Sequence, residues 1–208
     1  MGEPREKLYK VLVDGKNCHG GIMSWSLPSE DGTPGDWHEV DGPTTLCHHG
    51  FHLTHDPVQW WKPRCEVYEA EAEDLGESDA AKIVVRKVRL LRRLDDEELA
   101  ALRIFRSGQR EARDAEKYIA SGSARVLAMD SAQVQVLDSA QVKASDSAHV
   151  AAAYTATVVV HQGEPKVTLY EGAAKVDWRS GRARFFRGKR PVADFEAIRA
   201  KAMDLDHG

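Results

Sequence analysis

Five short units of the form Ser/Thr-Ala-x-Val follow one another at a constant interval of eight residues in the second half of the chain. They occupy residues 123–126, 131–134, 139–142, 147–150 and 155–158. In each unit the alanine, the valine and a further small apolar residue alternate with mostly polar positions. Alternation with a period of two places one set of side chains on one face of a β-strand, and an even repeat keeps that face inward in every unit.

This repeat fits two architectures, a short β-solenoid and an up-and-down meander. The small inward residues favour the solenoid, because its narrow interior has no room for larger side chains. Two-residue hairpins prefer Asn-Gly or Asp-Gly, and neither dipeptide occurs within the repeats. Asp130, Asp138 and Asp146 precede serines and suit tight turns. The three carboxylates also suggest a ladder along one edge that would bind calcium, but we favour the role in turns.

The rest of the chain predicts two further zones. Residues 1–94 read as an α+β domain, with strands expected over 8–13, 47–54, 66–72 and 82–94 and a short helix from Asp56. Residues 95–121 read as a helical connector that begins with an Asp95/Glu98 capping box. Residues 122–208 then form the solenoid, closed by a final helix over 191–205. The expected fold class is therefore α+β, with a small mixed domain followed by a β-solenoid.

Composition limits the classes of function. The 208 residues carry a formal net charge of −4, which gives no overall attraction to nucleic acids or acidic membranes. Charged residues fill the N-terminus where a signal peptide would be apolar, and no apolar run is long enough to span a bilayer. We therefore expect a cytoplasmic protein with no membrane partner. Three cysteines without framework spacing agree with a reducing compartment.

Thiols and imidazoles gather between residues 47 and 55. Cys47, His48, His49, His52 and His55 lie within this stretch, with Cys18 and His19 before it and Cys65 after it. These are zinc-type ligands, but no Cys-x2-Cys or His-x3-His pair fixes the geometry of a metal site. We favour a reading in which the cysteines are buried and the histidines line a strand and a loop, and we predict no metal.

Two basic stretches raise the question of nucleic-acid binding. Residues 82–93 contain six cations and no acid, and residues 178–190 interleave arginines with aromatic residues. The acids between Glu66 and Asp79 could neutralise the cations of the first stretch. We favour solvated strand faces over a nucleic-acid surface, and the partner stays an unidentified protein or nucleic acid. The solenoid edges also offer a route to homo-oligomers.

One stretch resembles a known family. Gly50-Phe51-His52-Leu53-Thr54, followed by residues 56–61, resembles the strand and helix of ADP-ribosyltransferase-like domains, and residues 82–94 are similar to a valine-rich strand of the rifampin-modifying members. The resemblance implies an NAD-binding fold over the first 94 residues.

The same resemblance implies roles for particular residues. His52 falls where the family stacks a tyrosine on nicotinamide, and the acidic position falls on Glu71, Glu73 or Asp74. With Tyr9 of the opening strand, His52 and Glu71 would be the working residues of the transferase. The resemblance also implies that NAD would contact Phe51, Thr54 and Trp60. The family's first histidine has no counterpart after Leu8-Tyr9, where Lys10 follows, and only a shifted alignment would let His19 take its place.

The whole layout also resembles uncharacterised phage and bacterial proteins that join a Gly-Phe-His domain to Ser-Ala-x-Val repeats. Two functions follow as expectations. One is NAD-dependent ADP-ribosyl transfer to an unknown target, in the host cytoplasm if the chain is phage-encoded. The other is a non-enzymatic interaction or structural module built on the solenoid.

Overall fold

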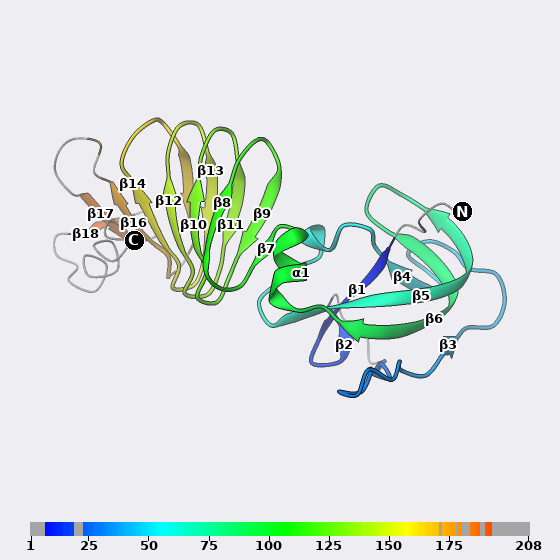
Figure 1. The fold of residues 1–208 in the computed structure, drawn as a ribbon. Helices are drawn as coiled ribbons and strands as arrows, with labels where there is room; N and C mark the ends of the chain where they lie inside the picture. Colours follow the sequence, from blue (N-terminus) through cyan, green and yellow to red (C-terminus); the bar gives the residue numbers. More distant parts are fainter. Residues whose placement is uncertain are drawn as a thin grey trace, which may run out of the picture. The chain divides into compact units, whose positions relative to one another are not determined.

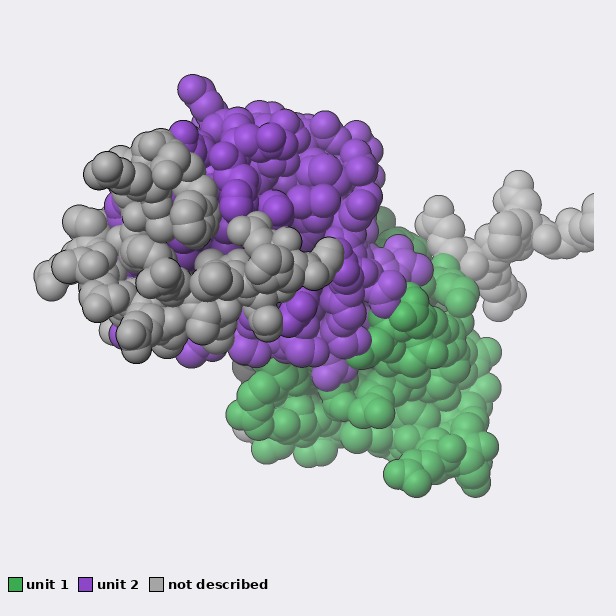
Figure 2. Space-filling model, turned by 60° about the vertical axis from the view of Figure 1, so that its left-hand side comes forward, with its two compact units in different colours: residues 1–98 green, residues 99–208 purple. Residues whose placement is uncertain are grey.

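The computed structural model describes residues 7–18, 23–170, 172–177, 179, 184–187 and 190–192. The chain divides into two compact units, residues 1–98 (unit 1) and residues 99–208 (unit 2), which Figure 2 colours separately. Strands dominate both units, and the only α-helix among the described residues is α1 (Asp96–Ala101). The expected α+β class therefore overstated the helix, and the described fold is mostly β.

Unit 1 is a curved antiparallel sheet built around one long hairpin. The hairpin pairs β5 (Cys65–Ser78) with β6 (Ile83–Arg93), and β1 (Leu8–Val13) lies on the other side of β5. Three short strands complete the sheet: β2 (Lys16–Asn17) on β1, and β3 (His38–Glu39) and β4 (Phe51–Leu53) on β6. The four strands expected from the sequence correspond to β1, β4, β5 and β6. The short helix expected from Asp56 is a single 3-10 turn, η1 (Pro57–Gln59), with its proline at the start.

The sheet of unit 1 closes on itself where β4 ends (Figure 1). The backbone N–H of Tyr9 donates to the Thr54 carbonyl over 2.8 Å, and the N–H of Thr54 donates back over 3.0 Å. Strands β1, β5, β6 and β4 thereby form a ring without a free edge between β1 and β4. Its core is a cluster of mostly large side chains, including Leu12, Trp25, Phe51, Leu53, Tyr68 and Leu90.

Gly50 allows β4 to pack against β6. Its φ angle of +118° is one that side-chain-bearing residues rarely adopt. A Cβ atom at this position would lie 2.5 Å from a methyl group of Val84 and 3.2 Å from the Val85 carbonyl oxygen. The glycine of the Gly-Phe-His motif is therefore explained by close packing within the sheet.

Unit 2 is a β-solenoid with two sheets, and the stacked strands of each sheet are parallel (Figure 1). Val126 pairs with Val142 and Val142 pairs with Val158, so strands stack on those sixteen residues away. Two strands make one turn, and each eight-residue unit supplies half of it. The parallel pairing confirms the solenoid and excludes the meander, in which neighbouring strands would be antiparallel.

The strands of unit 2 alternate between the two sheets. One sheet contains β8 (Gln109–Ala112), β10 (Arg125–Ala128), β12 (Gln141–Ala144), β14 (Thr157–Val160) and β16 (Ala174–Asp177). The other contains β7 (Ile104–Phe105), β9 (Lys117–Ala120), β11 (Gln133–Val136), β13 (His149–Ala152) and β15 (Lys166–Leu169). At the end of the first sheet, β17 (Arg184–Arg187) and β18 (Arg190–Val192) add antiparallel strands.

The solenoid interior contains the residues that the repeat predicts. Ala124, Val126 and Ala128 of one unit, and their equivalents in the others, form a continuous buried core. The interior changes at β16, where Asp177 is 1% exposed and its carboxylate binds the Arg179 guanidinium over 2.8 Å. This ion pair, with Lys175 at 3.5 Å, gives the final described rung a polar interior.

The turns of the solenoid confirm the role favoured for the three aspartates and exclude the alternative of a ladder along one edge. Asp130, Asp138 and Asp146 occupy turns as predicted, with φ angles of +54°, +55° and +53°. A unit of eight residues makes half a turn, so residues of the same corner recur once per full turn, after two units. The Ser147 hydroxyl donates to the Asp130 carbonyl at one corner, and the Thr155 hydroxyl donates to the Asp138 carbonyl at the other. Asp138 thus lies at the other corner from Asp130 and Asp146, and the three carboxylates do not share one edge.

The helical connector expected over 95–121 is also wrong beyond its first turns. The Asp95/Glu98 capping box is present, since each backbone N–H bonds the other side chain, over 3.1 Å and 2.8 Å. The helix ends at Ala101, and β7, β8 and β9 follow. Stacking of β8 and β9 on the repeat strands β10 and β11 outweighs the weak local preference for helix. The final helix expected over 191–205 lies outside the described residues from 193 onward, and Arg190–Val192 is strand.

Candidate functional site

A cleft of about 720 Å³ opens in unit 1 beside the junction of β1 and β4. Its size lies in the range typical of small-molecule sites. Its aromatic lining comes from Tyr9, Trp25, Phe51 and Trp60. Its polar and thiol lining comes from Lys10, Asn17, Cys18, Cys47, His48, His52, Thr54 and Lys82. Strands β1 and β4 meet only because the sheet closes, so the cleft is a product of the ring.

Lys10 is the most buried cation of this cleft. Its side chain projects from β1 and the residue is 9% exposed. The Nζ atom donates to the backbone carbonyl of His52 over 3.0 Å and lies 4.7 Å from the centre of the Trp25 ring. Burial lowers the pKa of this amine to about 8.

The aromatic wall of the cleft is held in place by its own contacts. The Trp25 ring meets His38 and Phe51 edge-on, with ring centres 5.2 Å and 5.6 Å apart. The indole N–H of Trp25 donates to Asn17 Oδ1 over 3.0 Å, and His38 Nε2 accepts the Ser26 N–H over 3.0 Å. These bonds fix the flat surface over which Lys10 lies.

His52, Cys47 and Lys82 form the rim of the cleft. The Cys47 backbone N–H donates to His52 Nε2 over 2.9 Å, so the neutral imidazole carries its proton on Nδ1. Burial, and then the charges of Lys10 and Lys82, lower the pKa of His52. Lys82 Nζ lies 2.9 Å from the Cys47 thiol and 5.6 Å from the centre of the Trp60 ring. The neutral form of His52 is thus favoured near neutral pH.

The cleft lining contains cations but no carboxylate among the described residues. Asp79 lies outside this lining, and its charge raises the pKa of His52 and of Lys82. It accepts the backbone N–H groups of Ala81 and Lys82 over 2.8 Å and 2.9 Å. The described walls therefore carry positive and aromatic groups.

The structure brings five of the six residues implied by the resemblance to one place. Tyr9, Phe51, His52, Thr54 and Trp60 all line the cleft. Glu71 does not, because it lies on β5 with its carboxylate 2.6 Å from the Arg89 guanidinium.

Two of these five residues have structural roles that the sequence did not indicate. The Thr54 hydroxyl donates to the Ala81 carbonyl over 2.8 Å, and the Trp60 indole N–H donates to the same carbonyl over 3.1 Å. Thr54 is also 3% exposed. Their polar atoms hold the end of β4 against the β5–β6 turn. The apolar ring of Trp60 therefore forms part of the cleft wall, while its N–H is already bonded.

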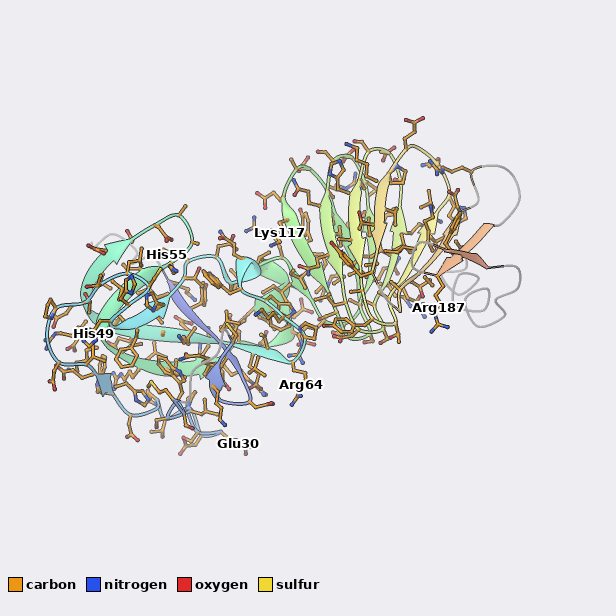
Figure 3. All side chains as sticks on the ribbon, turned by 180° about the vertical axis from the view of Figure 1, so that it is seen from behind. Glu30, His49, His55, Arg64, Lys117 and Arg187 are labelled. Atoms are coloured by element: carbon orange, nitrogen blue, oxygen red, sulfur yellow. The ribbon has the colours of Figure 1, made fainter. Side chains whose placement is uncertain are left out.

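The thiols and imidazoles that the structure describes do not gather into a possible metal site, and His19 of the predicted cluster lies outside the described residues. No group of three or more metal-ligating side chains occurs in the part of the chain that the structure describes. His49 bonds the Asp41 carbonyl over 2.7 Å and His55 bonds the Lys7 carbonyl over 3.0 Å, and Figure 3 shows the two rings apart. Cys65 is buried as expected, which raises its pKa to about 11, whereas Cys47 is exposed.

The first basic stretch is neutralised across the β5–β6 hairpin, as the sequence suggested. Each of its strand cations faces an acid of the neighbouring strand. The pairs are Arg93–Glu66, Arg92–Glu69, Arg89–Glu71, Lys87–Glu73 and Arg86–Asp74. The second stretch, residues 178–190, lies largely outside the described residues.

Sequence reasoning missed Lys10 and Trp25. A signal for Lys10 was present, because it is the one cation within the apolar strand sequence of β1, Leu-Tyr-Lys-Val-Leu-Val. A lysine inside such a strand is either paired or placed in a site. Trp25 lies in an irregular segment without periodicity, so nothing local indicated its burial.

Among the described residues, no helix is long and apolar enough to cross a membrane. Comparison of the chain with protein-family models, with curated proteins and with solved structures found no match.

Proposed function

We propose that this chain is a non-catalytic binding protein in which unit 1 holds a small molecule in its cleft and the solenoid is a rigid support. The cleft carries the proposal. It combines a volume of about 720 Å³ with flat aromatic walls and a few converging polar groups. That combination is typical of sites that bind small molecules.

The polar groups of the cleft suit recognition better than acid–base chemistry. General acid–base catalysis usually pairs two titratable groups with different pKa values. In the described lining, His52 has no carboxylate to orient it, and its Nε2 atom accepts a backbone N–H. A site of this composition orients a bound molecule through its donors and ring faces.

The solenoid suits a supporting role because its core is closely packed and continuous. The inward alanines and valines of the repeats are between 0% and 2% exposed. Each turn contacts only its neighbours, so the unit forms a stiff rod whose outer faces are set by the polar repeat positions.

NAD-dependent ADP-ribosyl transfer is a second candidate, favoured by one observation. Tyr9, Phe51 and His52, to which the resemblance assigns contacts with NAD, line the same cleft. NAD would supply the ADP-ribosyl group and release nicotinamide. The acidic position fits less well, because Glu71 is paired with Arg89 away from the cleft.

Ligand titrations monitored by thermal unfolding test the first proposal. NAD, AMP and nicotinate at millimolar concentration should be compared, and at least one should raise the transition of unit 1, because a ligand that binds only the native state stabilises it. A Met23→Trp variant, which narrows the cleft, should lose this rise. Leu75→Trp, at an exposed position outside the cleft, should keep it.

The same experiment distinguishes the binding protein from the transferase. Release of nicotinamide from NAD at a rate that depends on His52 would support the transferase and contradict a purely binding role. A rise in the transition without release supports the binding protein. If none of the three compounds shifts the transition of unit 1, the binding proposal is wrong.

A further inference from the structure

The ammonium group of Lys10 has fewer partners than its charge requires. A lysine ammonium has three N–H donors. Among the described residues, Lys10 Nζ has one hydrogen-bond acceptor, the His52 carbonyl at 3.0 Å, and one ring face, that of Trp25. Both are neutral groups, so no acid in the described part of the chain balances the charge of this buried cation.

Two other partly buried cations among the described residues are balanced by acids. Arg92 lies 2.7 Å from Glu69 and 2.6 Å from Glu98. Lys175, whose side chain is 17% exposed, has the buried carboxylate of Asp177 at 3.5 Å. Buried charges are generally paired, because an unpaired charge loses its hydration without compensation. Lys10 departs from this pattern at the wall of a cleft that is large enough for a ligand.

The surroundings of Lys10 also indicate the shape of the missing partner. The Trp25 and Phe51 rings provide flat apolar surfaces in the same cleft. A ligand beside Lys10 would share the cleft with these rings, which favour a planar group. The described lining offers no carboxylate that would repel a negative charge.

We propose that the cleft binds a planar ring that carries an oxyanion, a carboxylate or a phosphate ester, and that this anion pairs with Lys10 Nζ. This inference rests on the binding function proposed above and names the class of ligand. The pair completes the charge balance of Lys10, and the ring contacts Trp25 and Phe51.

Binding of this kind depends on pH. Without ligand the pKa of Lys10 is about 8, and a bound anion raises it. Affinity should be constant well below pH 8 and should fall above it, by up to tenfold per pH unit, because binding then requires uptake of a proton. Two titratable groups interact with Lys10: Cys18, beyond β2, and His52, on β4. A Cys18→Ser variant separates the thiol from this effect.

Two matched pairs of probes test the proposal. Nicotinate and nicotinamide differ by one charged group on the same ring, and AMP and adenosine differ by a phosphate. Dissociation constants should be measured by NMR titration or calorimetry on the full chain at pH 7 and pH 9. At least one anion should bind tenfold or more tightly than its neutral partner at pH 7, and this preference should shrink at pH 9. The pair that shows it identifies the carboxylate or the phosphate as the preferred group.

Variants assign the effect to Lys10. Lys10→Met should abolish the preference for the anion, whereas Lys16→Met, which removes a charge on β2 outside the cleft lining, should retain it. Equal binding of anion and neutral partner by the wild type, or an unchanged preference in Lys10→Met, would overturn the inference and leave the binding function intact. If neither these four probes nor NAD binds, the binding function fails and this inference fails with it.

Discussion

The two units of this protein bury their apolar residues in different ways. Unit 2 stacks alanines and valines from successive units of eight residues, and its core is continuous from turn to turn. Unit 1 surrounds a few large side chains, among them Trp25, Phe51 and Tyr68, with a sheet that closes on itself. Small repeated residues fill a core completely, whereas large residues on an irregular frame leave space between them. The candidate site lies in the irregular unit for this reason.

The comparison predicts that one inward charge unfolds unit 2 alone. Val142 is fully buried in the solenoid, and Val142→Asp would place a carboxylate without partners there. We expect loss of about 4 kcal/mol or more from the free energy of unfolding of unit 2. Differential scanning calorimetry should show that transition lost while the transition of unit 1 stays. Gln135→Asp, at an outward position of β11, is the control, and similar behaviour of the two variants would contradict the inward assignment.

The second largest effect is expected in unit 1, with the opposite sign. Lys10→Met removes a buried charge and should raise the free energy of unfolding of unit 1 at pH 7 by about 3 kcal/mol. The folded pKa of about 8 is below the ordinary value of 10.5, so between these values the unfolded chain binds a proton that the folded chain does not.

The contribution of Lys10 should therefore raise the free energy of unfolding of wild-type unit 1 as the pH rises from 8 to 10.5. The difference between Lys10→Met and wild type should be largest below pH 8 and vanish near pH 10.5. Urea unfolding at several pH values measures it. A difference that does not change with pH would show that Lys10 is not buried as a cation.

A turn of the solenoid should respond more weakly than its core. Asp138 has a φ angle of +55°, in the left-handed region. Asp138→Ala should cost unit 2 about 1 kcal/mol, because alanine adopts this region less readily than aspartate. Asp138→Gly, which has no Cβ, should cost less, as measured by chemical denaturation. A larger loss for glycine than for alanine would mean that the carboxylate, and not the backbone angle, sets the turn.

The smallest effect is expected on the outer face of unit 1. Glu73 and Lys87 form a 2.7 Å ion pair whose side chains are 53% and 26% exposed. Glu73→Gln should change the free energy of unfolding by no more than about 0.5 kcal/mol, because exposed ion pairs contribute little. Thermal unfolding at low and high salt measures this. A loss above 1 kcal/mol would indicate that the row of ion pairs on the hairpin acts as a cooperative network.

Sequence reasoning succeeded where a pattern was local and repeated. The period of eight predicted the strands, their inward residues and the turns at Asp130, Asp138 and Asp146. It did not indicate that two units make one turn, which places Asp138 at a different corner. It also failed before the repeats, where β8 and β9 lack the Ser-Ala-x-Val pattern and become strands by stacking on their neighbours.

The candidate site was found only in part. The Gly-Phe-His motif marked β4, and five of the implied residues line the cleft. Glu71 was misplaced, because neighbouring residues of a strand face opposite sides and its side chain lies with Arg89. Lys10 was overlooked as a site residue, since its importance depends on the Trp25 ring and on the carbonyl of His52, which are distant in sequence.

The sequence by itself determined that the second half of this protein consists of repeated strands with a core of alanine and valine, and it favoured a β-solenoid over a meander. An eight-residue period carries that information, because each unit needs only a copy of itself to bury its inward face. The tertiary structure alone decided that unit 1 has a cleft with a buried cation. The cleft exists because the Tyr9 and Thr54 backbones pair across forty-five residues, and no local pattern encodes a contact between such distant segments.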